Sequence, residues 1–164
     1  MNKAVFLDRD GVINIDSGYI SQISDIRFYK GIYSILRYLQ KQGFILIIVT
    51  NQSGIERGYF TKDDLNKIHR YMIYKLRKHG IKITSIFYST SQDNENHYRK
   101  PNPGMLLLAK EKFNINMKNS ILIGNKKSDI IAGKRAGIGC NILFQDNDLA
   151  DYRISKLGYI KRIV

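Results

Sequence analysis

In the stretch Phe6-Leu7-Asp8-Arg9-Asp10-Gly11-Val12-Ile13-Asn14, an apolar segment runs directly into two aspartates, which predicts a strand followed by a functional loop. The segment from Lys3 to Asp8 is apolar and ends in a carboxylate, which is typical of a buried strand with a polar group at its carboxyl end. Two carboxylates so placed repel each other unless a proton or a cation lies between them. Mg²⁺, which takes oxygen ligands and binds phosphate, suits this arrangement.

The chemistry that this loop can perform is phosphoryl transfer. Asp8 can attack phosphorus and form an aspartyl-phosphate. Asp10 can protonate the leaving alcohol and later activate water. Gly11 lets the chain turn close to the phosphate. The alternative, a solvated loop with aspartates as helix caps, does not explain an apolar strand that runs directly into the Asp8 loop.

Strands and helices alternate along the rest of the chain. Four further apolar runs predict strands at residues 44–50, 84–89, 120–124 and 140–144. Helical periodicity, caps and closing glycines predict helices over residues 31–42, 61–79, 103–113 and 128–136. From Asp146 onward we expect a polar helix or loop that ends in a short strand, Tyr159 to Val164. The alternation predicts an α/β fold with a parallel sheet covered on both faces.

The bulk properties suit one compact domain over residues 1–164, with little room for a separate cap. The chain has 164 residues, 43% of them hydrophobic, and a single cysteine, Cys140, which excludes an internal disulfide framework. Its longest apolar run, residues 44–49, is too short to span a bilayer. We therefore expect a soluble, cytoplasmic protein. The charge of +13 suits anionic ligands, but the lysines are scattered, which favours a solvated surface for most of them.

Polar residues follow the predicted strands at their carboxyl ends. Asp8, Thr50 and Asn125 each follow or end an apolar run, and Lys100 falls in the loop after the third strand. In open parallel sheets, ligands bind outside these strand ends. These residues are therefore expected to meet at one site.

These motifs resemble those of the haloacid dehalogenase superfamily. Asp8-Arg9-Asp10-Gly11 resembles its first motif, Thr50-Asn51 its second, Lys100 in Arg99-Lys100-Pro101 its third, and residues 124–129 occupy the place of the fourth. The resemblance implies a Rossmannoid three-layer sandwich with a mostly parallel central sheet and no large cap domain. It also implies that Lys100 neutralises phosphate charge during transfer.

Three longer strings, residues 6–14, 50–58 and 99–105, resemble the branch that contains the heptose bisphosphate phosphatases and the histidinol-phosphate phosphatases. This implies a magnesium-dependent phosphomonoester hydrolase that acts on a small phosphorylated sugar. Removal of the 7-phosphate of heptose 1,7-bisphosphate, for lipopolysaccharide or capsule synthesis, is the favoured reaction, with histidinol phosphate as its rival. The implied phosphate-binding residues are Thr50, Asn51, Gln52, Ser53, Arg57, Arg99, Lys100 and Lys126, and the implied metal ligands are Asp8, Asp10, Asn125 and Asp129. A bisphosphate needs a second anion site, for which Arg99 is the best candidate and Arg57 is another.

Two departures from the branch matter. The zinc loop that usually precedes Arg-Lys-Pro is replaced by residues 88–98, which contain no cysteine and one histidine, His97, so we predict that zinc is absent. Asn125 stands where a metal-binding aspartate is usual, and the lost negative charge predicts weaker magnesium binding. Asp129 is the remaining acid of this motif, and in the superfamily it tends to support the site from behind.

Two other functions remain open. Parts of the second and third motifs also resemble polynucleotide 3′-phosphatases, but the first motif differs and the tyrosines are not concentrated near the motifs, so nucleic acid is the less favoured partner. A degenerate relative that binds a phosphorylated ligand without turnover would be supported by Asn125 alone. We expect a monomer or a weak homodimer.

Overall fold

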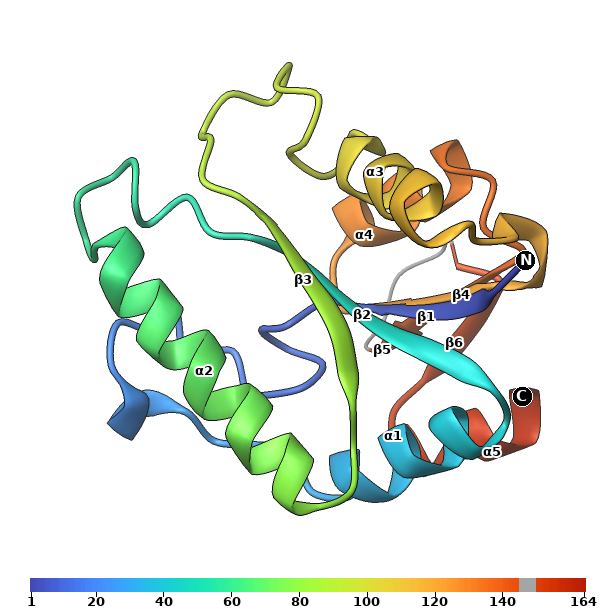
Figure 1. Ribbon diagram of the computed structural model, residues 1–164. Helices are drawn as coiled ribbons and strands as arrows, with labels where there is room; N and C mark the ends of the chain where they lie inside the picture. Colours follow the sequence, from blue (N-terminus) through green and yellow to red (C-terminus); the bar gives the residue numbers. More distant parts are fainter. Residues whose placement is uncertain (145–149) are drawn as a thin grey trace.

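Six parallel strands form the centre of the computed structural model, which describes residues 1–144 and 150–164 (Figure 1). The strands are β1 (Lys3–Leu7), β2 (Phe44–Asn51), β3 (Ile83–Ser89), β4 (Ile121–Gly124), β5 (Cys140–Phe144) and β6 (Tyr152–Ile154). Their order is β3-β2-β1-β4-β5-β6, and every neighbouring pair is parallel. Because the winding reverses between β1 and β4, the carboxyl ends of these two strands flank the expected ligand crevice.

Helices cover both faces of the sheet and make the three-layer sandwich. On one face lie α1 (Ile32–Lys41), α2 (Lys62–Lys78) and α5 (Ile160–Ile163), and on the other lie α3 (Gly104–Phe113) and α4 (Lys127–Arg135). Side chains of β1 alternate between the two cores: Val5 and Leu7 pack toward the first set of helices, and Ala4 and Phe6 toward the second. A strand buried on both faces reads as a continuous apolar run, so the predicted α/β fold is confirmed.

The helix boundaries follow the local signals in the sequence. At the start of α2, Thr61 Oγ1 accepts a hydrogen bond from the Asp64 backbone N–H (3.1 Å), and Asp64 Oδ2 accepts one from the Thr61 N–H (3.0 Å). This reciprocal cap satisfies two N–H groups that the helix leaves free. Gly43 and Gly80 follow α1 and α2 with φ of +84° and +73°, a conformation that favours glycine. The predicted helices therefore start and stop within a residue of those observed.

The end of the chain differs from the prediction. The segment from Tyr159 to Val164 is not a strand; a 3₁₀ turn, η3 (Leu157–Tyr159), leads into α5. Leu157 and Ile160 are buried three residues apart, a helical spacing that places both against the core beside α1. The sixth strand is instead β6, which pairs with β5. The part of the predicted segment at residues 145–149 lies outside the described residues.

Long loops gather at the carboxyl edge of the sheet. Residues 8–31 follow β1, and residues 90–103 follow β3. The only helix in these two loops is the short 3₁₀ helix η1 (Ile23–Asp25). Loops rather than a folded cap therefore surround the strand ends. No helix in the described part of the chain is both long and apolar enough to cross a membrane.

Candidate active site

Asp8 occupies the carboxyl end of β1, where β4 holds it in place. Its backbone N–H donates to the carbonyl of Ile123 (3.0 Å). Its Oδ1 accepts a hydrogen bond from the Nζ of Lys100 (2.9 Å), which also donates to the Val49 carbonyl (2.8 Å). The same Nζ lies 2.6 Å from an oxygen of Asp129. Groups from the end of β1, from β2 and from the first turn of α4 thus meet at one buried ammonium.

The buried charges shift the pKa values of this group in opposite directions. Burial alone would lower the pKa of Lys100, but Asp129 and Asp8 outweigh it and raise the pKa, so the ammonium stays charged. For Asp8, burial raises the pKa to about 6; Lys100 opposes this, and the charges of Asp129 and Asp10 add to it. One ammonium shared by two carboxylates neutralises Asp8 only in part.

Asp10 is held by a set of donors that sequence reasoning missed. Its carboxylate accepts two hydrogen bonds from Arg9 (3.0 and 2.7 Å), one from Asn14 (2.9 Å) and one from Gln52 (3.0 Å). Burial would raise the pKa of Asp10, but the Arg9 guanidinium and these hydrogen bonds lower it below the usual value. Arg9 therefore supplies one cation beside the aspartate pair, and the proton or metal ion expected between the two aspartates stays a prediction.

Arg9 is itself buried and contacts a residue of α2. Its side chain is 1% exposed, and its Nη1 lies 3.4 Å from Nε2 of His69 on α2. The sequence around Arg9 does not predict its contact with His69, because His69 is 60 residues away in the chain. Only the mutual placement of β1 and α2 could reveal it.

The oxygen atoms around Asp8 fit a divalent cation. One terminal atom of the Asn125 amide lies 3.1 Å from Asp8 Oδ2 and 3.2 Å from the backbone oxygen of Asp10. With the amide oxygen in that position, three oxygens converge, a donor set that suits Mg²⁺. Three carboxylates, Asp8, Asp10 and Asp129, face two cations, Arg9 and Lys100, which leaves one negative charge in the cluster.

The donor set has limits that bear on which metal could bind. Among the described residues, no three or more His, Cys, Asp and Glu side chains are arranged so that they could together hold a metal ion. Both oxygens of Asp129 are engaged: Oδ1 with Lys100, and Oδ2 with the backbone N–H groups of Asn125 (3.1 Å) and Lys126 (2.9 Å). This position, predicted as a metal ligand, fits support of Lys100 better than direct ligation.

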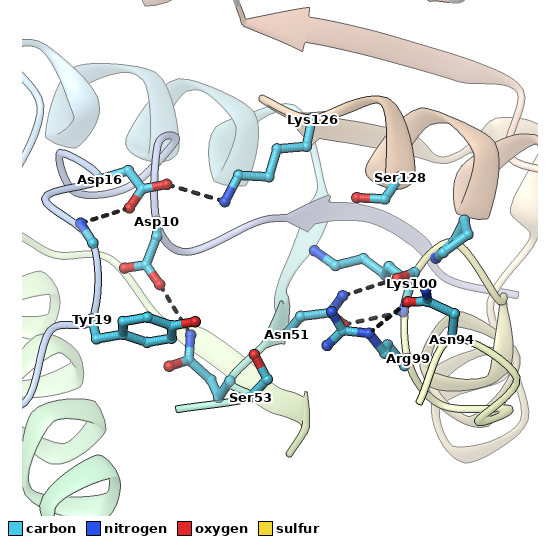
Figure 2. Close-up of a pocket in the computed structure, with 13 residues that line it drawn as sticks. Asp10, Asp16, Tyr19, Asn51, Ser53, Asn94, Arg99, Lys100, Lys126 and Ser128 are labelled. Atoms are coloured by element: carbon cyan, nitrogen blue, oxygen red, sulfur yellow. Dashed lines mark hydrogen bonds and ion pairs between the residues drawn. The ribbon is translucent and has the colours of Figure 1, made fainter. Parts of the chain in front are cut away.

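A cavity of about 410 Å³ opens beside these residues. Figure 2 shows Asp10 and Tyr19 on one side and Arg99 with Asn94 on the other. Its lining residues are Asp10, Asp16, Gly18, Tyr19, Asn51, Gln52, Ser53, Asn94, Arg99, Lys100, Pro101, Lys126 and Ser128. Most of the predicted phosphate-binding residues are therefore brought together. Thr50 is buried behind the cavity, where its Oγ1 accepts from Gln52 Nε2 (2.9 Å), and Arg57 is exposed on a turn away from the lining.

Asn51 also has a structural role, which its motif did not predict. Its Nδ2 donates to the Lys100 carbonyl (2.9 Å), and its Oδ1 accepts from the Lys100 N–H (3.1 Å). Both ends of the Asn51 amide therefore hydrogen-bond to the backbone of Lys100 and hold its loop in place.

Asp16 and Tyr19 are cavity residues that sequence reasoning missed. Asp16 Oδ2 pairs with the Nζ of Lys126 (3.1 Å) across 110 residues, as Figure 2 shows. Tyr19 packs edge-on against Tyr59, with ring centroids 4.6 Å apart, so two tyrosines do lie near the site. The polar run after the first motif was the available signal, but it does not reveal which loop residues turn inward.

The loop that replaces the zinc loop is held by polar contacts. Arg99 donates to the Ser91 carbonyl (2.6 Å) and to Asn94 Oδ1 (3.2 Å). Asn102 Nδ2 donates to the carbonyls of Asn94 (2.8 Å) and Asn96 (3.0 Å). These bonds set Arg99 at the cavity wall. The absence of zinc stays a prediction.

Comparisons with known proteins show similarity to phosphatases over most of the chain. A family model described as polynucleotide kinase 3 phosphatase matches residues 6–154. A D-glycero-alpha-D-manno-heptose-1,7-bisphosphate 7-phosphatase of Campylobacter jejuni is 46% identical over 144 residues, 88% of this chain and 83% of the relative. A D-glycero-beta-D-manno-heptose-1,7-bisphosphate 7-phosphatase of Helicobacter pylori is 42% identical over 150 residues, 90% of this chain and 87% of the relative.

Solved structures show the same arrangement of elements. A D,D-heptose 1,7-bisphosphate phosphatase from B. bronchiseptica, solved with magnesium and phosphate, superposes with a TM-score of 0.88 at 25% identity, over 98% of this chain and 97% of that one. A HAD-like phosphatase structure from Mesorhizobium loti gives 0.83 at 30% identity, over 96% and 83%. The chain therefore belongs to the haloacid dehalogenase superfamily, as a phosphatase of the family that includes the heptose-1,7-bisphosphate 7-phosphatases.

Proposed function

We propose that this phosphatase removes the 7-phosphate of D-glycero-D-manno-heptose 1,7-bisphosphate through an aspartyl-phosphate on Asp8, with Mg²⁺ as cofactor. The observation that carries the proposal is the placement of Asp8: one carboxylate oxygen accepts from Lys100, and the other faces the side-chain amide of Asn125. The names of the relatives from Campylobacter and Helicobacter support the choice of substrate.

In the first step, an Asp8 oxygen forms a bond to phosphorus while the bond from phosphorus to the sugar oxygen breaks. Asp10 gives its proton to that oxygen. The charges of Lys100 and Arg9 balance the negative charge that gathers around phosphorus. In the second step, water loses a proton to Asp10 and attacks phosphorus, which releases phosphate and restores the Asp8 carboxylate.

The hydrogen bonds to Asp10 fit the second of its two roles, that of the base. Arg9, Asn14 and Gln52 favour its anion, the form that accepts a proton from water in the second step. The first step needs the protonated form. A substrate phosphate beside Asp10 raises its pKa by like-charge repulsion, which supplies that form when substrate is bound.

Asp8, the backbone carbonyl of Asp10 and the amide oxygen of Asn125 are the groups that would hold Mg²⁺. When bound, the cation supplies charge neutralisation for the phosphoryl oxygens. The B. bronchiseptica structure, which contains magnesium and phosphate, supports this choice of cofactor.

The cavity wall supports a small substrate with a second phosphate. Arg99 and Lys126 supply cations at the cavity wall, and Asp16 supplies an acceptor for sugar hydroxyls. A volume of about 410 Å³ lies in the range of small-molecule sites. With that substrate, the enzyme would act in the cytoplasm, in the synthesis of nucleotide-activated heptose for lipopolysaccharide or capsule.

A polynucleotide 3′-phosphatase is the second candidate, because the matching family model carries that description and the chain has a charge of +13. The test is phosphate release with Mg²⁺ from both anomers of heptose 1,7-bisphosphate, histidinol phosphate, fructose bisphosphate and a 3′-phosphorylated oligonucleotide. We expect the highest kcat/KM for one heptose anomer. Release from the oligonucleotide alone would overturn the proposal, as would a preference for histidinol phosphate.

A further inference from the structure

The side-chain amide of Asn125 lies between the Asp8 carboxylate and the turn at Gly11. One terminal atom faces two acceptors, Asp8 Oδ2 at 3.1 Å and the Asp10 carbonyl at 3.2 Å. The other lies against Gly11, where a Cβ would fall 1.9 Å from it. Gly11 has φ of +87°, so the turn passes close under the amide without a side chain. The turn therefore keeps the amide in place, with one terminal atom toward Asp8 and the other toward Gly11.

The two orientations differ in chemistry. With the oxygen toward Asp8, three oxygens converge without a hydrogen among them, an arrangement that requires a cation. With the nitrogen toward Asp8, its two N–H groups donate to Asp8 and to the Asp10 carbonyl. An aspartate at this position could offer only the first arrangement.

We propose that Asn125 is a positioning residue that holds the site together in two states. In the metal-free enzyme, its N–H groups bridge the end of β1 to the Asp10 turn, and when Mg²⁺ binds, the amide turns and presents its oxygen. The metal-bound state rests on the proposed function, because it requires Mg²⁺, whereas the bridge in the metal-free state does not rest on it.

The charge balance explains why an amide suits the metal-free state. Asp8, Asp10 and Asp129 already exceed Arg9 and Lys100 by one negative charge. A fourth carboxylate beside Asp8 would add repulsion in a buried place. The bridge instead adds two hydrogen bonds and no charge. Its consequence for the metal is weaker binding, because the cation displaces two hydrogen bonds and meets one fewer anionic ligand.

The experiment compares thermal unfolding of the full chain in EDTA, at about pH 8, where carboxyl groups are ionised. Asn125→Asp and Asn125→Ala each remove the bridge, and Asn119→Asp, at an exposed site on η2 (Met117–Asn119), controls for the added charge. We expect both Asn125 variants to melt lower by roughly 3 °C or more, with Asn119→Asp unchanged. Equal melting of Asn125→Ala and wild type would overturn the bridge.

Two readouts follow the metal without using activity. Side-chain amide NMR should show one NH₂ pair, absent in Asn125→Ala, that exchanges slowly with D₂O in EDTA and shifts on addition of Mg²⁺. Calorimetry should show Mg²⁺ binding to Asn125→Asp at least about tenfold tighter than to wild type. A pair that exchanges as fast as that of exposed Asn119 would overturn the bridge. If Mg²⁺ binds to neither chain, the metal half and the proposed function's cofactor are wrong, although the bridge survives.

Discussion

The ammonium of Lys100 lies between two carboxylates, 2.9 Å from Asp8 and 2.6 Å from Asp129. All three side chains are buried. Removal of one partner from a buried ion pair leaves an unpaired charge, which costs more than the pair itself contributes. Lys100 is therefore expected to contribute to both stability and catalysis. A variant that also removes one carboxylate charge can separate the two contributions.

We predict that Lys100→Met lowers the free energy of unfolding by roughly 3–5 kcal/mol and reduces kcat by at least about a hundredfold. The double variant Lys100→Met with Asp129→Asn removes one charge of each sign, so it should regain part of the stability and none of the activity. Denaturant unfolding and phosphate release measure the two effects. Recovery of activity in the double variant would show that Lys100 has only a structural role.

His69 predicts a pH dependence of stability. Burial, with Arg9 beside it, lowers its pKa from 6.5 to about 4 in the folded chain, against a smaller opposing effect of Asp10. Between these values the unfolded chain binds a proton that the folded chain does not, so the free energy of unfolding falls as the pH is lowered through this window, by at most about 3 kcal/mol.

The variant His69→Gln keeps an acceptor for Arg9 and should remove this part of the slope. His97→Gln, at an exposed position, is the matched control and should keep it. Asp8 acts in the opposite direction up to about pH 6, because its pKa is raised in the folded chain, but it does so equally in all three proteins. Parallel stability profiles for wild type and His69→Gln would contradict the prediction.

Arg99 predicts a split between substrates. If its guanidinium binds the phosphate that is not transferred, Arg99→Gln should raise KM for heptose 1,7-bisphosphate by roughly tenfold or more, the loss of a charge-assisted hydrogen bond. The simple monoester p-nitrophenyl phosphate, which has no second phosphate, should be hydrolysed with little change. Arg99→Lys keeps the positive charge but cannot make two parallel hydrogen bonds to a phosphate. Its KM for heptose 1,7-bisphosphate should therefore lie between those of wild type and Arg99→Gln. An equal loss on both substrates would mean that Arg99 only supports its loop.

Local signals in the sequence predicted most of the fold. The Thr61 cap, the closing glycines and the apolar runs depend on neighbouring residues, so each element could be placed without knowing the others. The C-terminal segment was the exception: β6 was not predicted, and Tyr159 to Val164 was interpreted as a strand, whereas Leu157 and Ile160 pack with helical spacing against the core.

The candidate site was predictable where one motif carries one group, as at Asp8 and Lys100. Contacts between distant segments were not. Asp16 reaches Lys126 across 110 residues, and Arg9 reaches His69 across 60, and no local pattern encodes either pair. The part played by Asn125 depends on what faces its amide, which only the packed turn at Gly11 reveals.

In the proposed mechanism, Asp8 itself carries the phosphoryl group during turnover. Mass spectrometry of enzyme quenched in acid during turnover of heptose 1,7-bisphosphate with Mg²⁺ tests it most directly. We predict one phosphoryl group, lost on treatment with hydroxylamine, on the peptide that contains Asp8. Asp8→Asn should show none and lose activity by at least roughly a thousandfold, whereas Asp63→Asn, at an exposed position of α2, should behave as wild type. Rapid turnover by Asp8→Asn, or a phosphoryl group on another residue, would contradict the account.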